Sequence, residues 1–316
     1  YLTAIDKYGH ELWRWTFPVD KLNQQTEQLS PLSSRPTYTE TENDLTVKAN
    51  KRTFIFSKKD GQLKGVSVDN RKINFANGPR FIGARRADRS LDQFYNHDDE
   101  KAKEKDRTYS EFPDAAVFTK LDVKEDGGNL VVTANYKLGN LDKAQWTINP
   151  SGDLALDYTY NFSGVVDLMG IRFDYPEDQV ISKRWLGAGP YRVWQNRIHG
   201  TQYDVWENDY NDPIPGETFT YPEFKGYFGD VSWMNIQTKE GTISLTNETP
   251  DTYIGVYQPR DGRDRLLYTL PESGISVLNV IPPVRNKVNS TDLCGPSSQP
   301  KWVNGPQTGR VIFRFM

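Results

Sequence analysis

The residues with the greatest chemical potential gather in one stretch, from Arg184 to Gly226. It holds three of the eight tryptophans, and its aromatic residues stand beside charged ones such as Arg197 and Glu223. Sugar rings have apolar C–H faces with hydroxyls around the edge, so a carbohydrate site combines flat aromatic surfaces with a few placed polar groups. The stretch therefore suggests carbohydrate binding. The alternative is a long loop with glycine and proline turns, whose aromatic residues cover the end of a β-sheet.

Carboxylates in the same stretch could in principle serve a glycosidase. They are Asp204, Glu207, Asp209, Asp212, Glu217 and Glu223. A glycosidase uses two carboxyl groups about 5 Å apart when it retains configuration and about 6.5–9.5 Å apart when it inverts it. Carboxylates in a polar loop are more often solvated or paired with arginine, so we predict no catalytic residue here. The sequence also contains no phosphate-binding glycine loop, nucleophile elbow or HExxH helix.

Metal and cofactor chemistry is not expected from the composition. Cys294 is the single cysteine, and the histidines are His10, His97 and His199. A cysteine- or histidine-based metal site is therefore not predicted. The HDDE segment at 97–100 lacks the spacing and the glycine turn of a calcium loop. We expect no metal and no cofactor.

The bulk composition limits the classes of partner. The 316 residues carry a net charge of −3, so they offer no basic field to nucleic acid or to an anionic membrane. No run of 18 or more apolar residues is present. We therefore expect neither nucleic acid nor membrane as a partner. The chain begins without methionine or signal peptide, which suggests a mature or excised fragment.

Short alternating runs separated by turn residues dominate the chain from about Thr39 onward, and they predict about 18 to 20 antiparallel strands. Residues 2–17 predict a β-hairpin, and a polar linker follows it. The segment from Gly78 to Arg107 is not strand-like, and residues 288–309 predict a long loop that carries Trp302. Trp185 is expected in the core. The predicted class is all-β.

Several motifs, in order, resemble one family. RTFIFSKKDGQLKGVSVDNRKI is similar to an F-x-F-x-x-x-x-G-x-L hairpin, and GPRFIGARRADRSLD stands where the family has F-R-A-P-x-D-N-D. The strand that enters the family's central motif is similar to DLMGIRFDYP. The central motif, W-x-G-x-G-P-x-E-x-Y-x-D-R, is similar to RWLGAGPYRVWQNR, and the later motif P-Q-E-x-G is similar to YPEFKG. Together they resemble the C-terminal, galactose mutarotase-like supersandwich of family 2 glycoside hydrolases of the β-galactosidase type. Departures include Arg192, Trp194 and Asn196, where the family has Glu, Tyr and Asp.

The resemblance implies a domain organisation and a role. Residues 39–316 would form the supersandwich, and residues 1–34 the tail of a preceding immunoglobulin-like domain plus a linker. The chain would be a non-catalytic part of a larger hydrolase whose catalytic glutamates lie on a TIM barrel. Its partners would be a glycoside or oligosaccharide and the rest of that hydrolase. By analogy with bacterial polysaccharide-degrading hydrolases, the expected location is periplasmic or secreted.

The carbohydrate-binding candidates combine the aromatic stretch with the resemblance. They are Trp194, Arg197, Trp206, Glu223 and Trp302. Trp302 matches, loosely, a tryptophan that some family members place at the rim of the active site. Arg197 and Glu223 occupy matching motif positions, where bracing the sandwich or its contact with the barrel is the expected role. Two alternatives stay open: a stand-alone carbohydrate-binding module, and an aldose 1-epimerase-like enzyme, which would need a histidine acid and a glutamate base.

Overall fold

The computed structural model describes residues 1–17, 34–86, 109–212, 214, 224–259, 270–284 and 295–316. These residues form 22 β-strands and two 3₁₀ helices, η1 (Glu177–Gln179) and η3 (Pro296–Ser298). Neighbouring strands pair antiparallel throughout the two large sheets. The predicted all-β class is confirmed. Among the described residues, no helix is long and apolar enough to cross a membrane.

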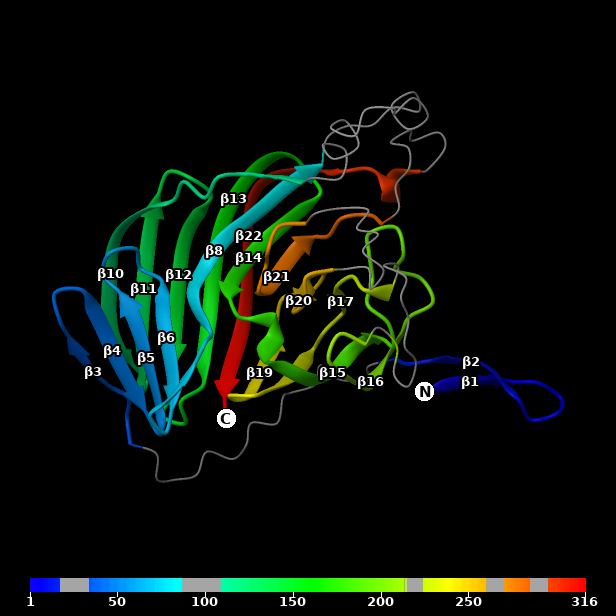
Figure 1. Cartoon of the computed structure of the whole chain (residues 1–316), viewed down its shortest axis with the longest axis horizontal. Coiled ribbons are helices and arrows are strands. Elements are labelled where there is room, and N and C mark those ends of the chain that lie inside the picture. Colours follow the sequence, from blue (N-terminus) through cyan, green and yellow to red (C-terminus); the bar gives the residue numbers. More distant parts are fainter. Residues whose placement is uncertain (18–33, 87–108, 213, 215–223, 260–269, 285–294) are drawn as a thin grey trace.

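Two large sheets face each other as a sandwich (Figure 1). The first has nine strands in the order β10-β11-β12-β13-β22-β19-β18-β15-β16. Its members are β10 (Val117–Asp126), β11 (Asn129–Lys137), β12 (Leu141–Ile148), β13 (Leu154–Val166), β15 (Val180–Gly189), β16 (Gln202–Asp209), β18 (Trp233–Thr238), β19 (Gly241–Asn247) and β22 (Lys301–Phe315). The consecutive run from β10 to β13 is an antiparallel meander.

The second sheet has eleven strands in the order β17-β20-β21-β14-β8-β6-β5-β4-β3, with β7 beside β6 and β9 beside β8. Its members are β3 (Thr37–Glu40), β4 (Asp44–Ala49), β5 (Arg52–Ser57), β6 (Leu63–Val68), β7 (Arg71–Ile73), β8 (Ala76–Arg86), β9 (Tyr109–Glu111), β14 (Leu168–Asp174), β17 (Phe228–Gly229), β20 (Tyr253–Gly255) and β21 (Ile275–Val280).

Aromatic side chains from both sheets fill the space between them. Strict alternation in β13 turns Leu156, Tyr158 and Tyr160 inward, because successive side chains of a strand point to opposite faces. Across the sandwich, Phe56 of β5 meets Trp146 of β12 with ring centroids 5.9 Å apart. The contact buries large apolar surfaces from both sheets, so the sheets form one core.

The fold corrects one prediction at β8. The segment from Gly78 was predicted not to be strand-like, but Ala76–Arg86 is an 11-residue strand. Its residues are buried on both faces near Ile82 and Ala84, so the hydrophobic alternation that marks a half-exposed strand is missing. Arg86 is buried as well, and its backbone N–H donates to Oδ2 of Asp167 at 2.9 Å. Residues 87–108, which include the acidic and basic run after Asp98, lie outside the described residues.

A second correction concerns the predicted loop around Trp302. Lys301–Phe315 is a 15-residue strand, β22, which pairs with β13 from Val166 to Leu154. On its other side β22 pairs with β19, but only over Val311–Phe315. The turn-type composition of its first half concealed a strand that is central to the sheet.

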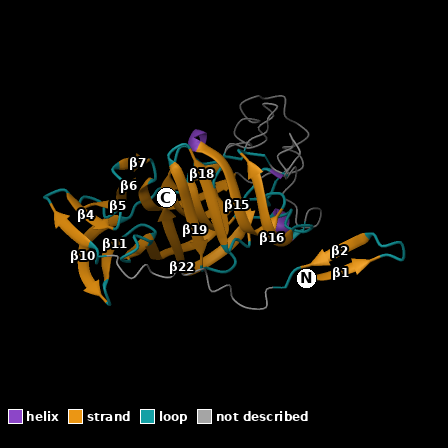
Figure 2. Cartoon of the chain, turned by 90° about the horizontal axis from the view of Figure 1, so that it is seen from below, coloured by secondary structure: helices purple, strands orange, loops and turns teal. Residues whose placement is uncertain are grey.

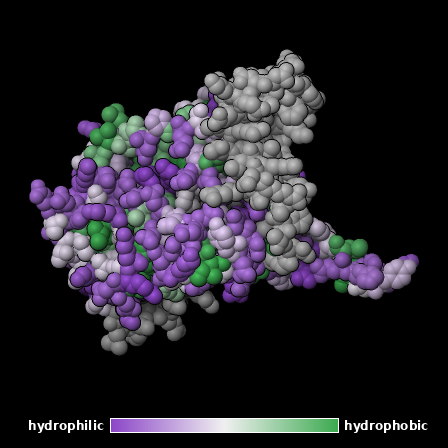
Figure 3. Space-filling view, in the orientation of Figure 1, coloured by the Kyte–Doolittle hydropathy of each residue, from purple (hydrophilic) through white to green (hydrophobic). Residues whose placement is uncertain are grey.

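The N-terminal residues form the predicted hairpin, β1 (Leu2–Ile5) with β2 (Glu11–Trp15). The hairpin stands apart from both large sheets and lies near β16 (Figures 1 and 2). A hydrogen bond of 3.0 Å from the Tyr1 hydroxyl to Oδ1 of Asp204 joins it to that strand. Apolar side chains on it are exposed to solvent (Figure 3). They include Leu2, Ile5, Leu12, Trp13, Trp15 and Phe17.

Candidate functional site

The first part of the stretch singled out in the sequence, as far as Asp209, is a hairpin and its connection rather than one long loop. Strands β15 and β16 pair from Ser182 with Asp209 to Gly189 with Gln202. Trp185 and Trp206 are directly opposite each other in this ladder. Trp185 is fully buried, as predicted, and packs edge-on against Phe228 with ring centroids 5.0 Å apart. The connection 190–201 carries the remaining motif residues.

Trp194, one of the predicted binding residues, belongs to the core. It is 2% exposed and lies edge-on to Tyr227, with ring centroids 5.8 Å apart. A Cβ atom on Gly226 would come within 2.9 Å of its indole nitrogen and 2.1 Å of the Val193 carbonyl oxygen. Glycine is therefore required there for close packing. The ring presents no free face to a sugar in this conformation.

Trp206 and Arg197 are closer to the surface. Trp206 is partly buried, its indole nitrogen donates to the Gln202 carbonyl at 3.1 Å, and its ring covers Gly189. Arg197 is exposed, and its guanidinium lies 5.8 Å from the ring centroid of Phe224. Its backbone N–H donates to the Trp194 carbonyl at 2.8 Å. These contacts bring Arg197 and Trp194 together through the backbone, whereas Trp206 lies on the neighbouring strand.

Glu223 and Trp302 are the other two predicted carbohydrate-binding residues, and only Trp302 is among the described residues. Glu223 lies outside the described residues. Trp302 is 71% exposed at the start of β22, opposite Val165 of β13. Its indole is therefore available to a ligand or a partner.

Polar side chains in the 190–201 connection brace neighbouring loops. The Gln195 amide nitrogen donates to the carbonyls of Ser297 and Gln299 at 2.8 and 2.7 Å. The Asn196 side chain exchanges two hydrogen bonds with the backbone of Val284. Gln195 thus anchors the segment that leads into Trp302. The motif holds three chain segments together at one end of the sandwich.

Two cations lie buried beneath this connection. Lys183 and Arg192 are each 1% exposed, and both lie against the ring of Tyr257, at 4.9 and 5.0 Å from its centroid. Burial, with a smaller effect of Arg192, lowers the pKa of Lys183 to about 6. Burial also lowers the pKa of Arg192 to about 10. Their hydrogen bonds go to the carbonyl of Asp209 and to Oδ1 of Asn211.

The sequence analysis missed this buried pair. Lys183 and Arg192 read as ordinary surface charges, because their partners lie 19 and more residues away along the chain. The one usable signal is Arg192 itself, a base that stands where the motif of the resembled family has an acid.

The carboxylates of β16 do not resemble a catalytic pair. Asp204 accepts from Tyr1, and Oε2 of Glu207 lies 3.6 Å from Nε of Arg184. The side chain of Glu207 is 70% exposed. A glycosidase acid needs burial to stay protonated near neutral pH, so these exposed carboxylates lack that environment. Among the described residues, no group of three or more histidine, cysteine or acidic side chains is arranged to hold a metal ion.

Comparison with solved structures finds distant similarity over nearly the whole chain. Galactose 1-epimerase from Lactobacillus acidophilus NCFM is 10% identical, with 90% of this chain and 99% of that chain covered and a TM-score of 0.47. The GalM/aldose epimerase homologue from C. elegans is 6% identical, with coverages of 89% and 99% and a TM-score of 0.39. A search of curated proteins returned no match.

Comparison with protein families gives one match that covers most of the chain. A profile of the beta galactosidase small chain matches residues 48–282. The matched region runs from β4 to the end of β21, so it contains strands of both large sheets and the whole 190–201 connection. The chain belongs to the beta galactosidase small chain family.

Proposed function

We propose that this chain is the non-catalytic sandwich portion of a family 2 glycoside hydrolase of the β-galactosidase type. It would support a TIM barrel that carries the catalytic glutamates and would shape the rim of the carbohydrate site. The family match over residues 48–282 is the observation that carries the proposal. The described residues contain two 3₁₀ helices and no α-helix, so the helices of a TIM barrel are not among them.

The motif geometry supports a bracing role. Gln195 and Asn196 hold backbone groups of residues 284, 297 and 299, while the β16 carboxylates are exposed or paired. Side chains that fix three loops at one end of a sandwich suit a surface that must keep its shape against a large partner. Trp302, exposed beside these loops, is the proposed contact with the substrate or the barrel.

The hairpin β1–β2 supports the proposed domain division. An isolated two-stranded hairpin is marginally stable in water, and this one leaves Trp13, Trp15 and Phe17 exposed. A partner surface that covers these side chains would stabilise it. We assign residues 1–34 to the tail of a preceding immunoglobulin-like domain with its linker, and residues 39–316 to the sandwich.

The test is to purify the native protein from its source cells with an antibody against this chain. The expected result is a larger polypeptide or a stable complex that contains a TIM-barrel hydrolase and cleaves an aryl β-glycoside. The recombinant chain alone should show no hydrolysis of the same substrates. Isolation of the chain by itself, with no glycosidase activity accompanying it, would contradict the proposal.

A carbohydrate-binding module is the second candidate, favoured by the exposure of Trp302. In that case the chain alone should bind oligosaccharides by calorimetry, and Trp302→Ala should abolish the heat of binding. The same samples also test epimerase chemistry by polarimetry with α-galactose and α-glucose. Mutarotation above the buffer rate would replace both proposals with an enzymatic one.

A further inference from the structure

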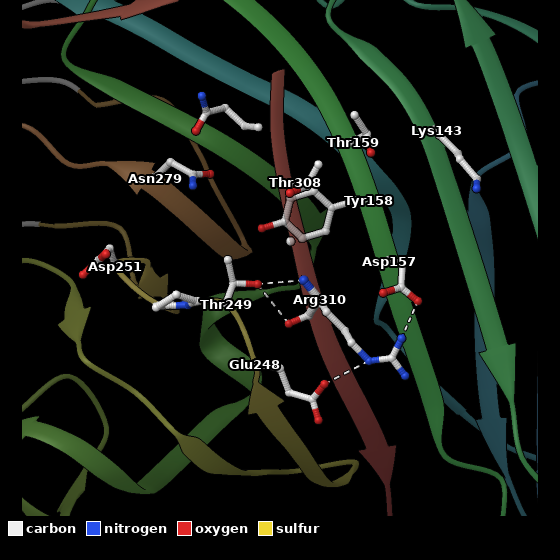
Figure 4. A pocket seen from close by; sticks show the side chains of 13 residues that line it. Lys143, Asp157, Tyr158, Thr159, Glu248, Thr249, Asp251, Asn279, Thr308 and Arg310 are labelled. Atoms are coloured by element: carbon white, nitrogen blue, oxygen red, sulfur yellow. Dashed lines mark hydrogen bonds and ion pairs between the residues drawn. The ribbon is translucent and has the colours of Figure 1, made fainter. Parts of the chain in front are cut away.

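A polar pocket of about 770 Å³ lies beside β22, away from the 190–201 connection (Figure 4). It is bounded by β13, by β22 and by the turn of residues 248–251 that follows β19. Pockets of this size accommodate small organic ligands.

The pocket exists because β19 leaves β22 early. The ladder between β19 and β22 ends at Asn247, opposite Val311, and Thr249 makes the last contact with β22. The backbone N–H of Arg310 donates to Oγ1 of Thr249 at 2.7 Å, and that hydroxyl donates to the Arg310 carbonyl at 3.2 Å. Beyond this point, the described part of the chain places no strand on the second edge of β22, and the space opens there.

Register places a row of polar side chains on the outer face of the sheet at this opening. Lys143, Thr159 and Thr308 are directly opposite one another on β12, β13 and β22. Neither threonine hydroxyl makes a hydrogen bond to another described residue, so both can serve a ligand. Figure 4 shows these side chains around one opening.

Arg310 places a charged guanidinium group on the same face of the sheet. Its guanidinium lies between Asp157 and Glu248, with Nε 2.9 Å from Oε2 of Glu248. All three side chains are about 40% exposed, at 40%, 38% and 40% for Arg310, Asp157 and Glu248. Because solvent reaches these side chains, a ligand can accept a hydrogen bond from the arginine and donate hydrogen bonds to the carboxylates. The ion pairs need not be buried for this to happen.

The Tyr158 ring forms the inner wall of the pocket. Tyr158 is 2% exposed, and its hydroxyl, which lies near Thr249, is covered by protein atoms, so a ligand does not reach it. The hydroxyl lies over Gly309, where a Cβ atom would come within 2.2 Å of it. The polar groups open to a ligand are therefore those on the outer face of the sheet, together with Asn279. Asn279 lies on the same side and accepts from Tyr160 at 2.6 Å, which leaves its amide N–H groups available.

The mixture of groups indicates the chemistry of the ligand. Lys143 and Arg310 are cationic, whereas Asp157, Glu248 and Asp251 are anionic, so neither sign dominates. A phosphate or acidic ligand would meet three carboxylates, and an amine would meet two cations. Each hydroxyl of a polyol both donates and accepts, which matches a wall of carboxylates, cations, threonines and an amide.

We propose that this pocket binds a short neutral saccharide, at a site separate from Trp302 and the Arg184–Gly226 stretch. The site depends on the folded sandwich alone. It does not require the hydrolase assignment, and it can bind sugar whether or not a barrel is attached.

The test is titration of the full chain with galactose, lactose and xylobiose, followed by calorimetry and by amide chemical shifts. We expect saturable millimolar binding, with shifts concentrated in residues 157–159, 248–251 and 307–310. Thr159→Val keeps the shape of the side chain and removes the hydroxyl, so affinity should fall about three- to tenfold. Thr133→Val is the matched control, because Thr133 lies on β11 of the same sheet but outside the pocket.

Other results would overturn the proposal. Absence of saturation with all three sugars would do so, as would equal affinity of the Thr159→Val variant and the wild type. Loss of binding in Trp302→Ala with retention in Thr159→Val would move the site to the end of the sandwich. Tighter binding of sodium galacturonate than of lactose would show that the pocket selects an anion. Thermal unfolding of each variant checks that it is folded.

Discussion

Three residues in or beside the Arg184–Gly226 stretch illustrate what a single sequence can and cannot predict. Trp185 was placed in the core from its position beside Leu186 and Gly187, and it is fully buried. Lys183 and Arg192 were not expected there, because nothing near them in the sequence neutralises a cation. Their partners are backbone carbonyls, Asn211 and the face of Tyr257, which the fold brings from other segments.

Truncation of Trp185 should be costly. We expect Trp185→Ala to lower the free energy of unfolding by about 3–5 kcal/mol, because it leaves a cavity against Phe228. Urea denaturation followed by tyrosine fluorescence measures the change. Trp302→Ala is the control, since a side chain that is 71% exposed should change stability by no more than about 0.5 kcal/mol. An equal loss in the two variants would mean that Trp185 does not pack as described.

Lys183 should make stability depend on pH. Burial lowers its pKa from 10.5 to about 6, so between these values the unfolded chain binds more protons than the folded one. Stability therefore rises with pH across this window, and the gain is lost as the pH falls toward 6. Lys183→Met should flatten the rise when urea midpoints are compared at about pH 6.5 and about pH 9.5.

The control for this experiment is Lys120→Met, whose ammonium is on an exposed strand and pairs with Asp122. It should keep the wild-type slope. A wild-type slope in Lys183→Met would show that the buried ammonium stays protonated through the window.

At the level of elements, the sequence predicts strands that are exposed on one face. It does not predict a strand that is buried on both faces or one that is rich in turn residues. β4, β5 and β10–β13 alternate or carry β-branched runs between turn residues, which is the pattern that predicts strands from about Thr39 onward. β8 lacks alternation because both its faces are covered. β22 contains Gly305, Pro306 and Gly309, which are typical of turns. A proline is tolerated where one strand edge is unpaired, and within the described part of the chain the first half of β22 has such an edge.

The hairpin β1–β2 should contribute little to the stability of the sandwich. We expect a chain lacking residues 1–17 to melt within about 2 °C of the full chain, because the joining hydrogen bond from Tyr1 to Asp204 is exposed. Removal of the exposed aromatic residues should also reduce self-association in light scattering. A fall of several degrees would show that the hairpin packs on the sandwich more firmly than described.

At the scale of the molecule, the two sheets form one core, and residues far apart in sequence complete each sheet. β22 separates the meander β10–β13 from the group β15, β16, β18 and β19. Phe313 reaches across the sandwich to Phe173 of β14, with ring centroids 5.4 Å apart. The polar pocket arises at this same junction. Asp157, Glu248 and Arg310 lie more than 60 residues apart in the sequence, so no local motif could have identified the pocket.

Loss of β22 should therefore abolish the fold. We expect a chain lacking residues 301–316 to show no near-ultraviolet circular dichroism and no cooperative urea transition, because β13 and β19 would both become open edges. The deletion of residues 1–17, which is of similar length, is the control and should leave a folded protein. A cooperative transition in the shortened chain would mean that the remaining strands close the sheet without β22.

The central place of β22 also has a consequence for synthesis on the ribosome. Both halves of the nine-stranded sheet are translated before the strand that joins them. Until residues 301–315 emerge, β13 and β19 present unpaired backbone groups to the cytosol or to a translocation channel. Such edges bind to other extended chains, so the nascent sandwich should depend on chaperones until β22 has been made.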